Sequence, residues 1–160
     1  MPQFARAIEY TVGRLMQEGH TVRVLAAHSL GANAAAFATA RGLPVQRLVL
    51  LAPPASPRAY TRYFASVFGL SEATRAAMQK RIETREAILM QQLEPDFVGP
   101  RIRVPTLVVH DHEDPINGFA DGQAFAHAIR GAELVATRGL GHRRILKDPG
   151  VLARVAVFGR

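Results

Sequence analysis

The segment that most constrains this chain is a serine flanked by small residues, Ala-His-Ser-Leu-Gly at residues 27–31. An apolar run at residues 21–26 leads into it, and an alanine-rich run at residues 32–40 follows it. This order predicts a strand, a sharp turn that carries Ser29, and a helix. Small residues on both sides avoid clashes as the chain reverses, so the usual pattern is Gly-x-Ser-x-Gly. Here Ala27 and Gly31 stand at the two glycine positions.

Length and composition limit the class of protein. A chain of 160 residues is long enough for one domain with a buried core. It contains no cysteine, which excludes disulfides and thiolate metal sites and favours a reducing, cytoplasmic compartment. No apolar run approaches the roughly 18 residues of a membrane span, and no signal-peptide pattern opens the chain. We therefore expect neither membrane insertion nor secretion.

The net charge of +7 raises the question of nucleic-acid binding. The basic residues are scattered, however, and form only short pairs such as Lys80-Arg81 and Arg143-Arg144. No basic stripe interleaved with aromatic residues is present, as a nucleic-acid site would favour. The pattern indicates an arginine-rich surface and no nucleic-acid partner.

Apolar periodicity predicts an α/β protein with a mostly parallel sheet and flanking helices. Strands are expected at residues 21–27, 45–51, 104–110 and 132–137, and helices at residues 3–18, 32–42, 119–130 and 148–157. Strands that alternate with helices imply right-handed crossovers between parallel neighbours. Residues 1–160 show no repeat or flexible linker, so we expect a single domain.

Residues 56–98 interrupt this rhythm, because they contain two helical patterns and no strand pattern. Tyr60, Phe64 and Phe68 mark the first helix, and the second follows Ser71. The insertion predicts a helical cap over the carboxyl edge of the sheet, where sites in open α/β folds lie. Two structural helices without a lid role fit the same amphipathic pattern equally well.

Candidate partners of the serine follow later strands. Residues 110–115 read His-Asp-His-Glu-Asp-Pro, and residues 138–142 read Arg-Gly-Leu-Gly-His. The carboxyl ends of parallel strands share one edge, so both loops are expected beside Ser29. The chain order Ser29, Asp114, His142 is that of a nucleophile elbow completed by an acid and a histidine. His142 would act as general base and Asp114 would fix its tautomer.

With these motifs in register, the chain resembles the C-terminal part of an α/β-hydrolase of the serine esterase and lipase-like superfamily. The matching segments are residues 27–32, 48–54, 104–115 and 139–142. The resemblance implies a serine hydrolase in which Ser29 is the nucleophile, Asp114 the acid and His142 the base. It also implies that the backbone N–H of Leu30 is an oxyanion-hole donor.

The implied reaction is hydrolysis of a small-molecule carboxylic ester or a related acyl bond. We expect His28 to help line the site, and Tyr60, Tyr63, Phe64 and Phe68 to contact an apolar part of the substrate. No organic cofactor is expected, since the sequence has neither a dinucleotide-binding nor a P-loop motif.

Two alternatives concern the acidic loop. Asp111, Glu113 and Asp121 compete with Asp114 for the role of the acid. His110, His112 and Asp114 could also form a metal site, because alternate residues of a strand share a face. A functional zinc site needs a third ligand and a supporting shell, for which the sequence gives no further signal. We therefore expect no metal.

The resemblance also predicts a departure from the family fold. The strands that precede the elbow helix in the family, and the second oxyanion donor they supply, are not found upstream of the elbow. The elbow strand at residues 21–27 would then be an open edge, which favours pairing with a second copy. The alternative function is a truncated, non-catalytic hydrolase remnant or an interaction domain.

Overall fold

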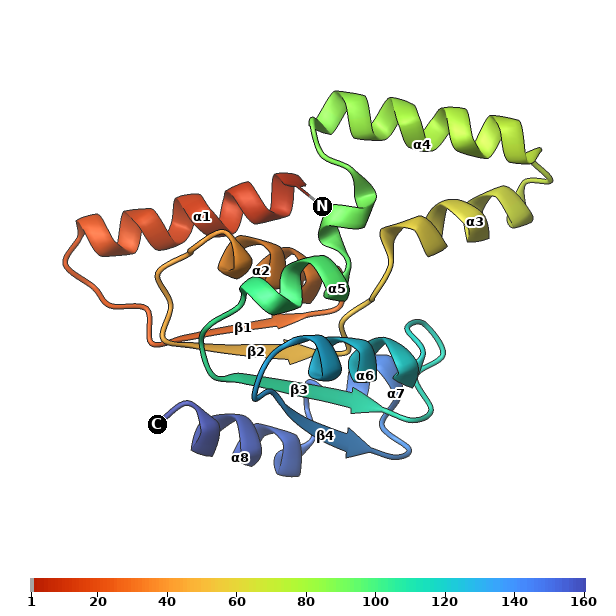
Figure 1. The fold of residues 1–160 in the computed structure, drawn as a ribbon. Coiled ribbons are helices and arrows are strands. Elements are labelled where there is room, and N and C mark those ends of the chain that lie inside the picture. The colour runs from red at the N-terminus through yellow and green to blue at the C-terminus, as the bar shows by residue number, and fades with distance from the viewer. Residues whose placement is uncertain (1) are drawn as a thin grey trace.

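The computed structural model describes residues 2–160 and contains a four-stranded sheet in the order β1-β2-β3-β4 (Figure 1). The strands are β1 (Val24–His28), β2 (Arg47–Leu51), β3 (Thr106–Asp111) and β4 (Glu133–Thr137). All three neighbouring pairs are parallel. The predicted α/β fold with a parallel sheet is thus confirmed, and all four carboxyl ends lie at one edge.

Strand boundaries differ from the predicted ones by at most three residues. β1 begins at Val24 and not at residue 21, and β3 begins at Thr106 and not at residue 104. Pro105 lies just before β3, and its carbonyl accepts the N–H of Leu48 at 3.0 Å. A proline lacks the N–H that a regular ladder needs, which is a physical reason for the later start.

Helices cover both faces of the sheet (Figure 1). The helices on one face are α1 (Pro2–Gln17), α2 (Leu30–Ala40), α5 (Pro95–Val98) and α6 (Phe119–Ala128); α7 (Gly141–Arg144) and α8 (Pro149–Phe158) lie on the other. Leu48, Leu50 and Val108 belong to the first core, and Val49 and Val109 to the second. Burial on both faces explains why β2 and β3 are almost continuously apolar.

Side chains that cap helices fix where the cap and the last helix begin. Ser56 precedes α3 (Pro57–Val67), Ser71 precedes α4 (Glu72–Glu86), and Asp148 precedes α8. Each accepts a hydrogen bond from a backbone N–H three residues later, as an N-cap does. The predicted helix starts at Ser71 and Asp148 are therefore found in the structure.

Helices α3 and α4 form a hairpin that projects beyond the carboxyl ends of the strands (Figure 1). Its two ends are joined at Glu94, whose carboxylate accepts hydrogen bonds from Ser56 Oγ and from Arg58 Nε at 2.8 Å. Short 3-10 helices at Met90–Leu93 and Gly99–Arg101 flank α5. Although α5 falls within the predicted insertion of residues 56–98, its Val98 is buried in the main core.

No helix among residues 2–160 is both long and apolar enough to cross a membrane. The longest described helix, α1, has 16 residues and carries several charged side chains, whereas a span needs about 20 apolar residues.

Strand β1 lies at one edge of the sheet in the described part of the chain. The carbonyl of Arg23 and the N–H of Ser29 both bond to β2. Because alternate residues of a strand point their backbone groups to opposite sides, those of Ala26 face the open edge. Ala26 is also exposed on the surface.

We expect the chain to self-associate through this edge, and Ala26→Lys to shift it toward the monomer, because a lysine on an edge strand discourages pairing. Sedimentation velocity over a concentration series measures this. Thr84→Lys, an exposed position on α4, adds the same charge elsewhere and serves as the control. Equal association of both variants and the unaltered chain would contradict the prediction.

Candidate active site

Ser29 occupies a strained turn between β1 and α2. Its φ of 54° and ψ of −128° lie in a region that residues with a side chain rarely adopt. Its N–H donates to the carbonyl of Leu51 at 2.9 Å, and its carbonyl accepts the N–H of Ala32 at 2.9 Å. The turn is therefore held by β2 on one side and by the first turn of α2 on the other.

The space around Gly31 is not crowded in this structure. A Cβ at Gly31 would have no neighbouring atom within 4 Å. Its backbone also lacks the positive φ that would favour glycine. A single methyl group would therefore fit at residue 31, and the expectation that a bulky residue would clash there stays a prediction.

Three side chains from three different loops meet at this turn. The Nε2 atom of His142 lies 3.0 Å from Ser29 Oγ, and its Nδ1 atom lies 2.7 Å from Asp114 Oδ2. Because the carboxylate only accepts, Nδ1 carries the proton and Nε2 is left to accept from the serine hydroxyl. The other oxygen of Asp114 accepts the N–H groups of Ile116 at 2.8 Å and Asn117 at 3.0 Å.

A cavity of about 660 Å³ opens beside Ser29 under the α3–α4 hairpin. Among residues 2–160, no charged side chain lines it. The lining residues are Ser29, Leu30, Asn33, Pro54, Pro57, Tyr60, Thr61, Phe64, Met78, Ile82, Met90 and Ile116. The hairpin therefore contributes a wall of the cavity that contains the serine.

A family model described as serine hydrolase matches residues 5–151. This chain belongs to the serine hydrolase family. A search of curated proteins found no match to the sequence.

Solved structures share the fold. An α/β hydrolase enzyme, MGS-MChE2, from the metagenome of Mar Chica lagoon sediments in Morocco is 19% identical with a TM-score of 0.65, and 98% of this chain covers 67% of it. An esterase domain from a Rhodothermus marinus protein is 18% identical with a TM-score of 0.68, over 97% and 66% of the two chains. A Pseudomonas aeruginosa PA01 hydrolase is 21% identical with a TM-score of 0.64, over 98% and 71%. The serine hydrolase thus has an α/β-hydrolase fold and spans about two thirds of the length of these structures.

Asp111, one of the alternative acids, turns away from His142. Its oxygens accept the Thr137 hydroxyl at 2.7 Å and the N–H groups of Glu113 at 2.9 Å and Leu140 at 3.0 Å. Burial raises the pKa of Asp111, but these bonds, with one from Gly141, outweigh it and lower the pKa to about 2. Asp111 thereby ties the loop that carries the histidine to the end of β3.

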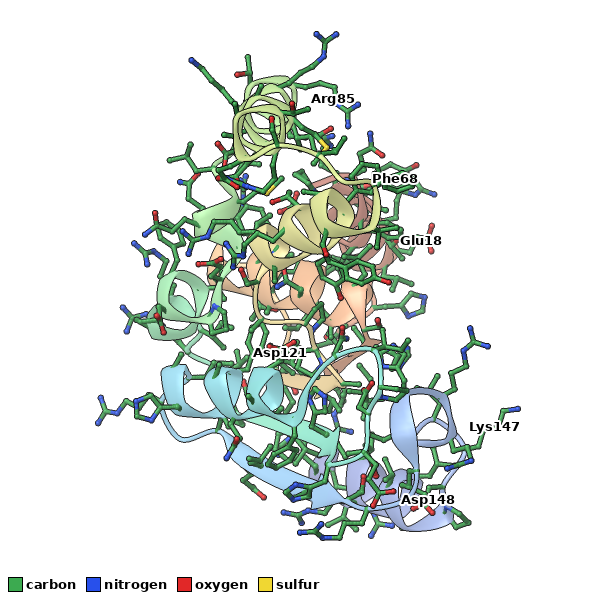
Figure 2. All side chains as sticks on the ribbon, turned by 90° about the vertical axis from the view of Figure 1, so that its right-hand side faces the viewer. Glu18, Phe68, Arg85, Asp121, Lys147 and Asp148 are labelled. Atoms are coloured by element: carbon green, nitrogen blue, oxygen red, sulfur yellow. The ribbon has the colours of Figure 1, made fainter. Side chains whose placement is uncertain are left out.

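Neither of the remaining acids, Glu113 and Asp121, forms a hydrogen bond with the imidazole of His142. Glu113 is exposed. Asp121 lies in the first turn of α6, where Figure 2 labels it. Burial raises the pKa of Asp121. The hydrogen bond from the N–H of Ala55 lowers this pKa, and the negative charge of Asp114 raises it. Of the four candidates, only Asp114 bonds to the imidazole.

The sequence predicts that His28, Tyr60, Tyr63, Phe64 and Phe68 line the site. Only some of these residues line the cavity in the structure. Tyr60 and Phe64 line the cavity, whereas Tyr63 and Phe68 are exposed outside it. His28 is not among the lining residues. Its Nε2 donates to the backbone carbonyl of His142 at 2.8 Å, and the two rings lie 4.6 Å apart. Burial lowers the pKa of His28, which keeps the ring neutral beside the other imidazole.

The three candidate metal ligands, His110, His112 and Asp114, do not form a cluster in the structure. His110 is buried, and its Nε2 lies 3.0 Å from the Asn117 carbonyl and 3.5 Å from Asp114 Oδ2. His112 is exposed and stacks on Phe119 with the ring centres 3.8 Å apart. Within residues 2–160, no three His, Asp or Glu side chains are grouped so that they could hold a metal ion.

Two buried asparagines near the serine were not anticipated. Asn33 donates its side-chain amide to the carbonyls of Pro54 at 2.9 Å and Leu93 at 3.0 Å, which ties α2 to the end of the cap. Asn117 follows Asp114 by three residues and contacts four segments of the fold. The only sequence signals were a polar residue in an alanine-rich helix and the turn-forming run Asp-Pro-Ile-Asn-Gly.

We expect the free energy of unfolding to fall as the pH drops from about 4 to 2, because Asp111 binds its proton at a lower pH in the folded state than in the unfolded state. Asp111→Asn should lower stability near pH 7 by roughly 1–3 kcal/mol, since its amide opposes the N–H of Leu140. It should also flatten the pH dependence in this window.

Urea unfolding from pH 2 to pH 7 measures both effects. Asp96→Asn, at an exposed carboxylate on α5, is the control and should follow the unaltered protein. A variant at Asp111 with an unchanged pH profile would refute the account of the loop.

Proposed function

We propose that this serine hydrolase cleaves a small-molecule carboxylic ester, or a related acyl bond, with Ser29 as nucleophile, His142 as general base and Asp114 as its acid partner. The observation that carries the proposal is the chain of contacts from Ser29 Oγ through the imidazole to the carboxylate, at 3.0 and 2.7 Å. These are the distances of a base within reach of the proton it removes.

In the first step, Ser29 Oγ attacks the carbonyl carbon while its proton passes to His142 Nε2. Asp114 holds the ring in the tautomer with the proton on Nδ1 and stabilises the imidazolium that forms. The negative charge moves to the carbonyl oxygen of the substrate. The N–H of Leu30, at the first position of α2, supplies one donor to that oxygen, aided by the helix N-terminus.

In the second step, His142 gives the proton to the departing alcohol, and an acyl ester on Ser29 remains. Water then loses a proton to the same Nε2 atom and attacks the acyl carbon. The acid leaves and the serine regains its proton. His28 helps to hold His142 in place during both steps, because its Nε2 donates a hydrogen bond to the backbone carbonyl of His142.

Covalent labelling with a fluorophosphonate, read by intact mass, tests the mechanism. We expect one label per chain, loss of labelling in Ser29→Ala, and labelling slowed at least roughly a thousandfold in His142→Ala. Ser66→Ala and His127→Ala replace exposed residues of the same types and are the controls. An unlabelled chain that is shown to be folded would favour the alternative of a non-catalytic interaction domain.

The cavity beside Ser29 supports an uncharged, apolar acyl group in the substrate. Tyr60 and Phe64 of α3 line it together with Met78 and Ile82 of α4, and none of the lining residues in the described part of the chain could compensate a buried charge. A volume of about 660 Å³ lies within the usual range of small-molecule sites.

We expect kcat/KM on p-nitrophenyl esters to rise about fourfold per added methylene until the cavity is filled, because burial of each methylene contributes about 0.8 kcal/mol. Ile82→Trp should shift the preferred ester to a shorter chain. Ala76→Trp, at an exposed position of the same helix, is the matched control. A chain-length profile that Ile82→Trp leaves unchanged would place the acyl group elsewhere.

A further inference from the structure

Asn117 connects four parts of the fold through hydrogen bonds. Its N–H donates to Asp114 Oδ1 at 3.0 Å, and its carbonyl accepts from His110 Nε2 at 3.0 Å. Its side-chain Nδ2 donates to the Ala52 carbonyl at 2.8 Å, and its Oδ1 accepts the Tyr60 hydroxyl at 2.7 Å. Asn117 is only 2% exposed, whereas its partner Tyr60 is partly exposed, so the polar atoms of Asn117 itself are shielded from solvent.

The orientation of the amide is fixed by its partners. Nδ2 faces a carbonyl, which can only accept, so the oxygen must face the Tyr60 hydroxyl. The acceptor residue Ala52 is itself strained, with a φ of 47° at the end of β2. Such a conformation persists only where the surroundings determine it. The side chain of Asn117 is thus held against the sheet and against the cap at once.

Tyr60 has two roles, because its ring lines the cavity and its hydroxyl binds Asn117. The ring lines the same cavity as Ser29. The hydroxyl leaves the cavity and reaches Asn117. Burial raises the pKa of Tyr60, and the charges of Asp121 and Asp114 raise it further, so the hydroxyl keeps its proton and donates.

The Asp114 carboxylate depends on the place of Asn117. Its Oδ1 is held by the backbone N–H groups of Ile116 and Asn117, and its Oδ2 faces His142. A shift of the Asn117 backbone would therefore rotate or displace the carboxylate. Because small displacements of a reacting group cost rate steeply, such a shift would be felt at Ser29.

We infer that Tyr60 and Asn117 form a positioning relay that couples the filling of the apolar cavity to the orientation of Asp114. The inference rests on the proposed function of the same site. An acyl group that packs on the Tyr60 ring holds α3 in place, and the hydroxyl then holds Asn117 and the acid. Substrates too short to reach the ring lose kcat as well as affinity, since binding away from the reacting bond is converted into positioning.

A double-variant cycle tests the relay. Tyr60→Phe keeps the ring and removes the hydroxyl, and Asn117→Ala removes the side chain but keeps the N–H to Asp114. We expect Tyr60→Phe to lower kcat on a long-chain ester about fivefold, the effect of one hydrogen bond, with KM unchanged within about twofold. The double variant should be no slower than Asn117→Ala alone, because the hydroxyl acts through that side chain. Tyr63→Phe, at an exposed tyrosine three residues further along α3, is the matched control.

A second readout is independent of catalysis. We expect the proton between His142 Nδ1 and Asp114 Oδ2 to give a downfield NMR resonance. This resonance should shift or broaden in Tyr60→Phe and in Asn117→Ala but not in Tyr63→Phe. A chain that does not react with fluorophosphonate would contradict the proposed function. The NMR resonance would still test whether Tyr60 and Asn117 position Asp114. A resonance unchanged in Tyr60→Phe, or kinetic effects that multiply in the double variant, would overturn the relay. Tyr60→Phe retains its value as a test should Asn117→Ala fold poorly.

Discussion

The parallel pairing of consecutive strands is the constraint on which the site depends. Ser29 follows β1, Asp114 follows β3, and His142 follows β4, so each belongs to a different part of the chain. Only a sheet whose strands all end at one edge brings these loops together. Two buried central strands, β2 and β3, keep that edge in register and separate the serine from the acid by a fixed distance.

Two carboxylates at the end of β3 and in the loop after it have different structural tasks. Asp111 is saturated with hydrogen bonds and organises the loop that carries His142, whereas Asp114 keeps one oxygen for the imidazole. The arrangement thus combines a rigid anchor with a partner that can respond to charge on the ring.

Sequence patterns predicted the sheet because apolar runs on both faces of a strand leave a clear signal. The order of Ser29, Asp114 and His142 along the chain also placed them at one edge. Spacing alone left Asp111, Glu113 and Asp121 open as acids, because it does not show in which direction each side chain points.

The contacts of Asn117 could not be read from the sequence at all. Its side-chain partners Tyr60 and Ala52 lie 57 and 65 residues away. The position of His28 behind His142, and not in the cavity, likewise depends on how two distant loops fold over each other.

The closed base of the α3–α4 hairpin has a consequence for how this protein can diversify. Glu94 binds Ser56 and Arg58, so the segment between them starts and ends at nearly the same point. Exchange of the α3–α4 part of that segment, residues 57–86, would leave the buried Leu93 in the main core and the strands where they are. Selection can therefore reshape the apolar wall as a module, and the Tyr60 hydroxyl marks the place where such an exchange would also reach the reacting groups.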